Sequence, residues 1–386
     1  MGETPTGLPA GHLRYRRNTM NRKLLFFLPV LGLLAGILLV TCQAPAGGMP
    51  SASAYTILAP IRHGNLSVFP VVAARSFDTR EFLTLDEGLR SGEVTVTESG
   101  SVQPLVRRRR TPTPSGAQVN QLVLVNNSKR PLILLAGEIV TGGKQDRVIG
   151  KDRIIPAESD PVDLGVFCVE PGRWVGSSDK FGVVGGVGGA VPAPIASPSV
   201  RAKAMADKDQ QQVWSEVAKT RTAMAETVTV EAAAQAINTT SSYARVMDNK
   251  EVKQRVDSVA EPIQRNYQSL IQQLRDQNAV GVVVAVNGQI VWADVFASTN
   301  LLEKYWPKLV RSYAAEAVVT RTKAGEVEVK RAQEFIDHLD GRHETVDSEP
   351  GLYRHTEIAG DGFRAFELTS LLPKTGFDLH VAKMAE

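Results

Sequence analysis

The chain has 386 residues, which is long enough for about two domains with hydrophobic cores of their own. Its formal charge of +3 comes from the N-terminus, because residues 1–41 hold five Lys or Arg and one acidic residue, and the remainder sums to −1. A nearly neutral main part lacks the positive charge that attracts a phosphate backbone, so we expect no nucleic-acid partner.

The first part of the chain has the pattern of an export signal. Five basic residues precede an uncharged apolar run, Leu24–Val40, and the true start is either Met1 or Met20. Three processing routes remain open: lipidation of Cys42, which ends a lipobox-like tetrapeptide, cleavage at the small residues Ala44–Ala46, or retention of the run as a short membrane anchor. Every route exports the rest of the chain, which is then tethered to the membrane or released to the periplasm or medium.

Composition divides the chain into four parts. Residues 1–46 form the export segment and tether, and residues 55–176 are rich in strand patterns. Residues 177–200 are rich in Gly, Pro, Ala and Ser, which is typical of a linker or a flexible insertion. Residues 201–384 mix helical and strand patterns, and we expect them to form an α+β domain that packs on the first.

Short runs of alternating or continuous apolar residues predict strands throughout residues 55–176. These runs are Tyr55–Ile61, Leu66–Val72, Glu93–Thr97, Val119–Asn126, Leu132–Val140, Arg147–Ile149, Arg153–Ile155 and Val162–Val169. A short helix or turn is expected at Thr84–Arg90, and the four arginines at 107–110 fit a solvated hairpin tip better than a binding patch. Many short strands with little helix indicate a mainly antiparallel β-sandwich or barrel.

The second half has a different pattern. Apolar residues spaced by three and four between Val252 and Leu274 predict an amphipathic helix, which Pro262 should kink or divide. Two apolar runs joined by Asn287-Gly288 predict a β-hairpin over 282–296. Further helices are expected at 201–230, 232–237, 301–319 and 327–339, and closing strands at 353–358, 363–368 and 377–382. The predicted fold class is therefore α+β, with a small antiparallel sheet in this half.

The stretch Pro131–Trp174 concentrates charge and glycine between apolar runs, and it holds the candidate site. Its first polar group contains Gly142, Gly143, Lys144, Gln145, Asp146 and Arg147. This group is not a nucleotide-triphosphate loop, because an extra glycine precedes Lys144, Gln145 replaces the hydroxyl residue, and no helix pattern follows. The two glycines still permit a backbone nest that binds an anion.

Two glutamates, Glu138 and Glu170, each follow an apolar run of this stretch. If the two predicted strands pair, the carboxylates approach each other beside Lys144 or Arg147, which is a workable general acid–base arrangement. The alternative is that the charges sit at strand ends and pair with one another in water. Arg173 and Trp174 follow Glu170, and the indole either stacks on a ligand ring or covers a core edge.

Other site types have little support in the sequence. Cys168 lies between apolar residues, which is typical of a buried and unreactive thiol. The histidines show no metal-binding spacing, so no metal or cofactor is expected. The run 182–189 is rich in glycine but lacks the strand and helix that a dinucleotide-binding loop needs.

The segments Leu134–Arg147, Ile154–Ala157 and Val166–Trp174 resemble the signature of one bacterial family. It is the ARG and rhodanese-phosphatase-superfamily-associated protein domain family, in which ARG means ADP-ribosylglycohydrolase. Further similarity lies at Tyr55–Leu66 and in the hairpin Gly281–Phe296. The resemblance implies association with ADP-ribose and NAD-derivative processing, and hence a nucleotide-derived ligand, but no settled chemistry.

Three hypotheses follow for the exported part. The first is a module that binds a small polar or anionic ligand through the Glu138–Arg147 and Glu170–Trp174 motifs. The second is a hydrolase of a glycosyl or phosphoester bond, with Glu138 and Glu170 as acid and base. The third is a purely structural envelope protein, in which these charges are individually paired and line no pocket.

Overall fold

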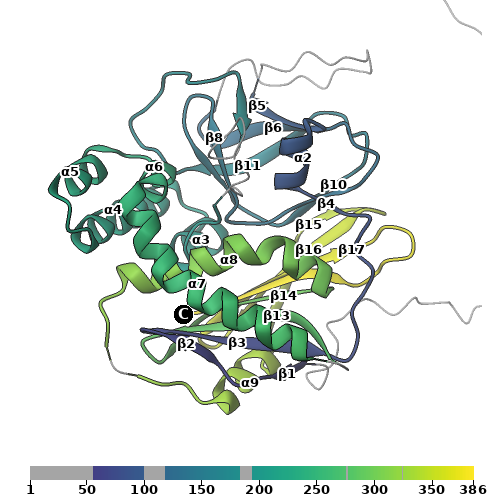
Figure 1. The fold of residues 1–386 in the computed structure, drawn as a ribbon. Helices are drawn as coiled ribbons and strands as arrows, with labels where there is room; N and C mark the ends of the chain where they lie inside the picture. Colours follow the sequence, from purple (N-terminus) through teal and green to yellow (C-terminus); the bar gives the residue numbers. More distant parts are fainter. Residues whose placement is uncertain (1–54, 100–117, 183–193, 275–276, 324) are drawn as a thin grey trace, which may run out of the picture. The chain divides into compact units, whose positions relative to one another are not determined.

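The computed structural model of the protein describes residues 55–99, 118–182, 194–274, 277–323 and 325–386. These residues form the predicted α+β fold, with mainly antiparallel sheets and a closed barrel (Figure 1). The residues predicted to form an export segment, Cys42 among them, the four-arginine loop and most of the glycine-rich run 182–189 lie outside the described residues. In the part of the chain that the structure describes, no helix is long and apolar enough to cross a membrane.

Six strands close into a barrel in the order β11-β6-β5-β12-β8-β9. Their bounds are β5 Val94–Glu98, β6 Gln121–Asn126, β8 Ile139–Gly142, β9 Arg147–Ile149, β11 Val162–Cys168 and β12 Lys180–Gly182. Alternate apolar residues of these strands, such as Leu164 and Val166 on β11, form the barrel core. The same core takes residues from a three-stranded sheet and a short helix: β4 Leu83–Thr84, β7 Leu132–Leu134, β10 Arg153–Ile155 and α2 Leu85–Ser91.

The second large element of the fold is a nine-stranded sheet. Its strand order is β1-β3-β13-β14-β18-β17-β16-β15, and β2 pairs with β3 beside this series. The bounds are β1 Tyr55–Ile57, β2 Ile61–His63, β3 Leu66–Ala73, β13 Asn278–Val286, β14 Gln289–Phe296, β15 Gly341–Glu349, β16 Tyr353–Gly360, β17 Phe363–Ser370 and β18 Asp378–Ala385. The predicted hairpin is present as β13 and β14, joined at Asn287-Gly288, both of which have positive φ.

Helices cover both faces of this sheet. α7 (Lys250–Gln273) and α8 (Thr299–Val319) lie side by side over one face, where Ile263 and Leu309 share a core with Val284 (Figure 1). α9 (Val329–Asp337) packs on the opposite face, where Ile336 joins Val283. The alternation of Val283 and Val284 between the two cores follows from the two-residue period of a strand.

A group of helices joins the barrel to the sheet: α3 Pro198–Ala202, the π-helical turn η2 Lys203–Asp207, α4 Gln210–Thr227, α5 Glu231–Thr239 and α6 Tyr243–Asp248. Val213 and Tyr243 of this group pack on the outer face of the barrel, against Ile139 and Val148. The end of β11 is attached to α4, because the Gln210 amide exchanges two hydrogen bonds with the backbone of Cys168.

Four features differ from the sequence predictions. The strands β1 to β3 come from residues 55–176, yet β3 pairs with β13, so the large sheet crosses the predicted boundary. The run predicted at 132–140 is divided into β7 and β8, because Gly137 has a φ of +93° and turns the chain. Of the two outcomes predicted at Pro262, a kink or a division, the division is wrong, because α7 continues through Pro262 as one helix. The fourth feature is β15, a strand that was not predicted. It lies at the edge of the sheet and is exposed, so its residues are polar and do not show the apolar alternation of a half-buried strand.

Candidate functional site

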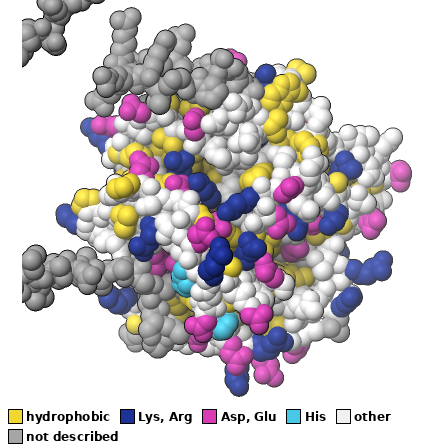
Figure 2. Space-filling view, turned by 180° about the vertical axis from the view of Figure 1, so that it is seen from behind, with side chains coloured by type: hydrophobic (Ala, Val, Ile, Leu, Met, Phe, Trp, Pro, Cys, Tyr) yellow, Lys and Arg dark blue, Asp and Glu magenta, His cyan; other side chains and the backbone are white. Residues whose placement is uncertain are grey.

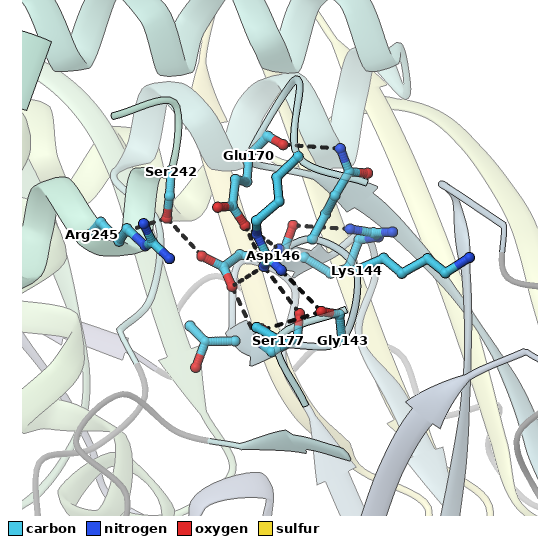
Figure 3. A network of polar contacts seen from close by, with 12 residues as sticks. Gly143, Lys144, Asp146, Glu170, Ser177, Ser242 and Arg245 are labelled. Carbon is cyan, nitrogen blue, oxygen red and sulfur yellow. Dashed lines mark hydrogen bonds and ion pairs between the residues drawn. The ribbon is translucent and has the colours of Figure 1, made fainter. Parts of the chain in front are cut away.

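The loop Gly142–Arg147 connects β8 to β9 at one end of the barrel. We call this end the barrel mouth and define it by Glu98, Gly142–Arg147 and Cys168–Trp174. Asp146 organises the loop from inside: one carboxylate oxygen accepts the Gly142 N–H at 3.1 Å, and the other accepts the Ser242 hydroxyl at 2.6 Å (Figure 3). Burial raises the pKa of Asp146 by more than the hydrogen bond from Ser242 lowers it, so the net shift is upward.

The second motif closes over this loop. Glu170 Oε2 accepts the Asp146 N–H at 3.0 Å and the Arg173 Nη2–H at 2.6 Å. The Arg173 guanidinium also donates to the carbonyls of Gly143 and Gly142, at 3.0 and 3.3 Å. The hydrogen bond to Glu170 raises the pKa of Arg173. Three predicted site residues, Asp146, Glu170 and Arg173, therefore form one mostly buried network that fixes the two glycines.

Lys144 and Trp174 form the outer part of the barrel mouth. The Lys144 backbone N–H donates to Glu98 Oε1 at 2.7 Å, and its Nζ lies 4.9 Å from the centroid of the Trp174 ring. Figure 3 shows the Lys144 side chain extending away from Asp146 and Ser242. Trp174 exposes 43 % of its surface and Val175 exposes 73 %, so an aromatic face and a cation lie together at the surface.

Arg147 is the predicted residue whose environment is least complete. It is fully buried, on the same side of β9 as Ile149, and opposite Val140 and Cys168 in the barrel. Among the described residues its side chain makes one hydrogen bond, a long one from Nη1 to the Asp146 carbonyl at 3.4 Å, and Nε and Nη2 have no partner. Burial lowers the pKa of Arg147, but an arginine keeps its proton in proteins. The barrel mouth thus contains a buried, incompletely paired cation.

Two acceptors of the barrel mouth also lack a partner among the described residues. Gln145 donates its amide N–H to the Glu170 carbonyl at 3.0 Å, while its Oε1 has no partner. Glu98 uses Oε1 for Lys144, while its Oε2 has none. Glu98 is close enough to favour the charged form of Arg147, yet the two side chains do not form an ion pair within 4.0 Å. Sequence reasoning missed Glu98, because it lies on a strand far from the signature.

Glu138 belongs to a different cluster. It is fully buried in the turn after Gly137, and its Oε2 accepts the Leu135 N–H at 2.7 Å. Its Oε1 accepts from the Lys308 ammonium, which also donates to Asp86 at 2.7 Å. Burial raises the pKa of Glu138 more than the Lys308 charge lowers it. In this cluster a buried lysine of α8, Lys308, lies between two carboxylates, Asp86 of α2 and Glu138 of the signature segment.

The two signature glutamates do not form the pair that the acid–base hypothesis needs. β8 and β11 both pair with β9, and their registers place Glu138 level with Val166, four residues before Glu170. Glu138 comes directly before β8 and Glu170 comes two residues after the end of β11, so the two glutamates lie at opposite ends of these strands. Each carboxylate has its own cation, Lys308 for Glu138 and Arg173 for Glu170.

A third cluster, which the sequence analysis did not identify, connects the barrel to the large sheet. Arg201 of α3 makes two hydrogen bonds to Asp294 of β14, at 2.8 and 2.9 Å, and Tyr313 also donates to Asp294. His380 of β18 lies between Asp294, at 3.1 Å, and Asp152, at 2.5 Å. Burial lowers the pKa of His380, but the carboxylates of Asp152 and Asp294 raise it by more, and the result is a pKa of about 9. The sequence did contain one indication of this cluster, because Asp294 is a charged residue inside an otherwise apolar strand and a buried charge needs a partner.

The remaining predictions concern cysteine and metal chemistry. Cys168 is buried, and burial raises the pKa of its thiol, which favours the protonated and less nucleophilic form. Among the described residues, no group of three or more His, Cys, Asp or Glu side chains is placed to hold a metal ion.

Figure 2 shows basic and acidic side chains side by side over one face of the molecule, in keeping with the many surface ion pairs.

Comparison with known proteins gives one result. A family model described as "ARG and Rhodanese-Phosphatase-superfamily-associated Protein domain" matches residues 54–382, which is most of the chain. No curated protein and no solved structure matches. The matched range includes the barrel, most of the large sheet and all three buried clusters.

Proposed function

The chain belongs to the ARG and Rhodanese-Phosphatase-superfamily-associated protein family, and we propose that it is a binding protein for a small anionic ligand, held at the barrel mouth. The observation that carries the proposal is the buried Arg147 guanidinium, two of whose nitrogens, Nε and Nη2, have no partner among the described residues. An unpaired charge away from water costs several kcal/mol, and an anionic group of a ligand offsets that cost.

The neighbouring acceptors narrow the ligand class. Within the part of the chain that the structure describes, Gln145 Oε1 and Glu98 Oε2 have no donor, so we expect the ligand to supply hydroxyl or N–H groups as well as negative charge. At the surface, Trp174 offers a ring face and Lys144 offers a second cation. A phosphorylated sugar or a nucleotide-derived molecule has all of these features, in keeping with the ADP-ribosylglycohydrolase association in the family name.

The proposal includes the location of the protein. The basic and apolar pattern of residues 1–46 supports export, with the main part tethered to the membrane through Cys42 or through the uncleaved run, or released after cleavage. Export is tested independently of the ligand by adding trypsin to cells. We expect the protein to resist trypsin in intact cells and to be digested once the outer envelope is permeabilised.

The ligand proposal is tested on the full chain by thermal unfolding with ADP-ribose, ribose 5-phosphate and inorganic phosphate. We expect stabilisation of about 2.7 kcal/mol at a hundred times the Kd. Lys144→Ala and Trp174→Ala, both at the surface, should weaken binding tenfold or more, whereas Lys219→Ala on α4 should not. If none of the three probes stabilises the protein, the barrel mouth does not bind this ligand class.

The hydrolase hypothesis makes a different demand. Because Glu138 and Glu170 lie in separate clusters, an enzyme at the barrel mouth would use Glu170 without Glu138. Product formation from an ADP-ribosyl or glycosyl substrate that disappears in Glu170→Gln and persists in Glu138→Gln would replace the binding function with this one. The structural hypothesis fits the paired Glu138, Asp146, Glu170 and Arg173, but leaves the open donors of Arg147 unexplained.

A further inference from the structure

A cavity of about 180 Å³ lies between α6, α7 and α8 and the segment before α3. Its interior wall is mainly apolar and includes Ile195, Ala244, Met247, Val256 and Ala315. An apolar cavity of about 150 Å³ stays dry and accepts benzene, so this one has room for a single ring.

The polar side chains in the wall already have partners. The Tyr243 hydroxyl accepts the Ser197 N–H at 2.9 Å, and the Ser312 hydroxyl donates to the Ala196 carbonyl at 2.6 Å. The Lys308 ammonium is bound by Glu138 and Asp86, so that side chain offers the cavity its methylene stem. No polar group among these three requires a hydrogen bond from an occupant, which favours an apolar one.

The rim of the cavity has the opposite character. Two ion pairs lie there, Lys253 with Asp248 and Arg311 with Asp257, and their side chains are 28 to 49 % exposed. Each pair bridges two of the three helices, α6 to α7 and α7 to α8. A polar group of an occupant can therefore remain in water beside charges of both signs while its apolar part is buried.

We propose that this cavity is a second binding site, which takes a small amphiphilic molecule with a single-ring apolar part inside and a neutral polar group at the rim. The site is separate from the barrel mouth and does not depend on the ligand proposed there. Its wall includes Lys308 and Ile195, which contact Glu138 through an ion pair and a strand bridge, so the occupant packs against the Glu138 cluster.

The test uses the full chain and two probes, toluene and benzyl alcohol, in thermal unfolding. We expect a saturable rise in Tm with both, and a higher affinity for benzyl alcohol because its hydroxyl reaches the rim. Ala315→Leu fills the cavity and should abolish the response, whereas Ala232→Leu, an exposed helical position on α5, should retain it.

A second filling variant, Met247→Phe at a half-buried position, provides the same test if Ala315→Leu does not fold. The absence of saturable stabilisation by either probe in the unchanged protein would overturn the proposal. So would a full response in both filling variants. Neither result bears on the barrel mouth, because its probes are anions and its variants are at Lys144 and Trp174.

Discussion

His380 Nδ1 lies 2.5 Å from Asp152 Oδ2, although the two residues are 228 positions apart and belong to different parts of the fold. Asp152 is in the turn between β9 and β10, and His380 is on β18 of the large sheet. Both side chains are fully buried, and His380 also contacts Asp294, which holds Arg201. One chain of charges therefore connects the signature region, α3 and the large sheet.

This contact predicts how stability depends on pH. The folded pKa of His380 is raised from 6.5 to about 9, so its stabilising contribution is complete below about pH 6.5 and is lost as the pH rises through 9. The pKa values of Asp152 and Asp294 are lowered in the fold, so their contributions are present above about pH 4 and are lost at lower pH. We expect the combined contribution of these three groups to the free energy of unfolding to be greatest between about pH 4 and 6.5, measured by urea unfolding.

His380→Gln is the matching variant. It should lower the free energy of unfolding at pH 6 by about 3–5 kcal/mol, because it leaves two buried carboxylates with less positive charge. The decline between pH 6.5 and 9 should become shallower in this variant. A slope identical to that of the unchanged protein would show that another group causes the decline. His343→Gln, on the exposed strand β15, is the control.

Arg147→Met separates ligand binding from stability. The side chain is buried with one long hydrogen bond, so an apolar side chain of similar length should leave the free energy of unfolding within about 1 kcal/mol or raise it. The same change should remove the stabilisation by anionic ligands. A loss of several kcal/mol in the ligand-free protein would mean that Arg147 is structural. Denaturant unfolding with and without ADP-ribose measures both quantities.

Lys308→Met should be among the more destabilising changes on α8. It leaves the buried Glu138 and Asp86 without their shared cation, at a cost of about 3–5 kcal/mol. Lys304→Met, one turn earlier on the same helix, removes a partly exposed ion pair with Glu87 and should cost less than about 1 kcal/mol. Adding Glu138→Gln to Lys308→Met should recover part of the loss, and strictly additive effects would show that the two residues are not coupled.

Gly137→Ala tests the turn that divides β7 from β8. Gly137 has a φ of +93°, and an added Cβ would lie 2.7 Å from Cγ of Arg201. We expect a loss of about 2 kcal/mol or more, from backbone strain and from displacement of Arg201. Gly165→Ala is the matched control, because a Cβ there meets nothing within 4 Å. Equal Tm values for the two variants would contradict this account.

Local patterns predicted most of the elements because each depends on nearby residues. The two-residue period identified β11, and the spacing of three and four identified α7, although its Pro262 did not divide it. The candidate site was predicted in part. Asp146, Glu170 and Arg173 do lie together, but Glu138 is elsewhere, because the turn at Gly137 sends it toward α8 instead of along a strand.

The α+β class and the hairpin at Asn287-Gly288 are predictable from residue types at short spacings, and the family is recognisable from its motifs. The pairing of β3 with β13 and the contacts of Lys308 with Glu138 and of His380 with Asp152 are visible only in the folded chain. The physical reason is that a charge buried in a strand or helix shows in the sequence only as an exception to the apolar pattern. Its partner is selected by packing between segments that the chain brings together from hundreds of residues away.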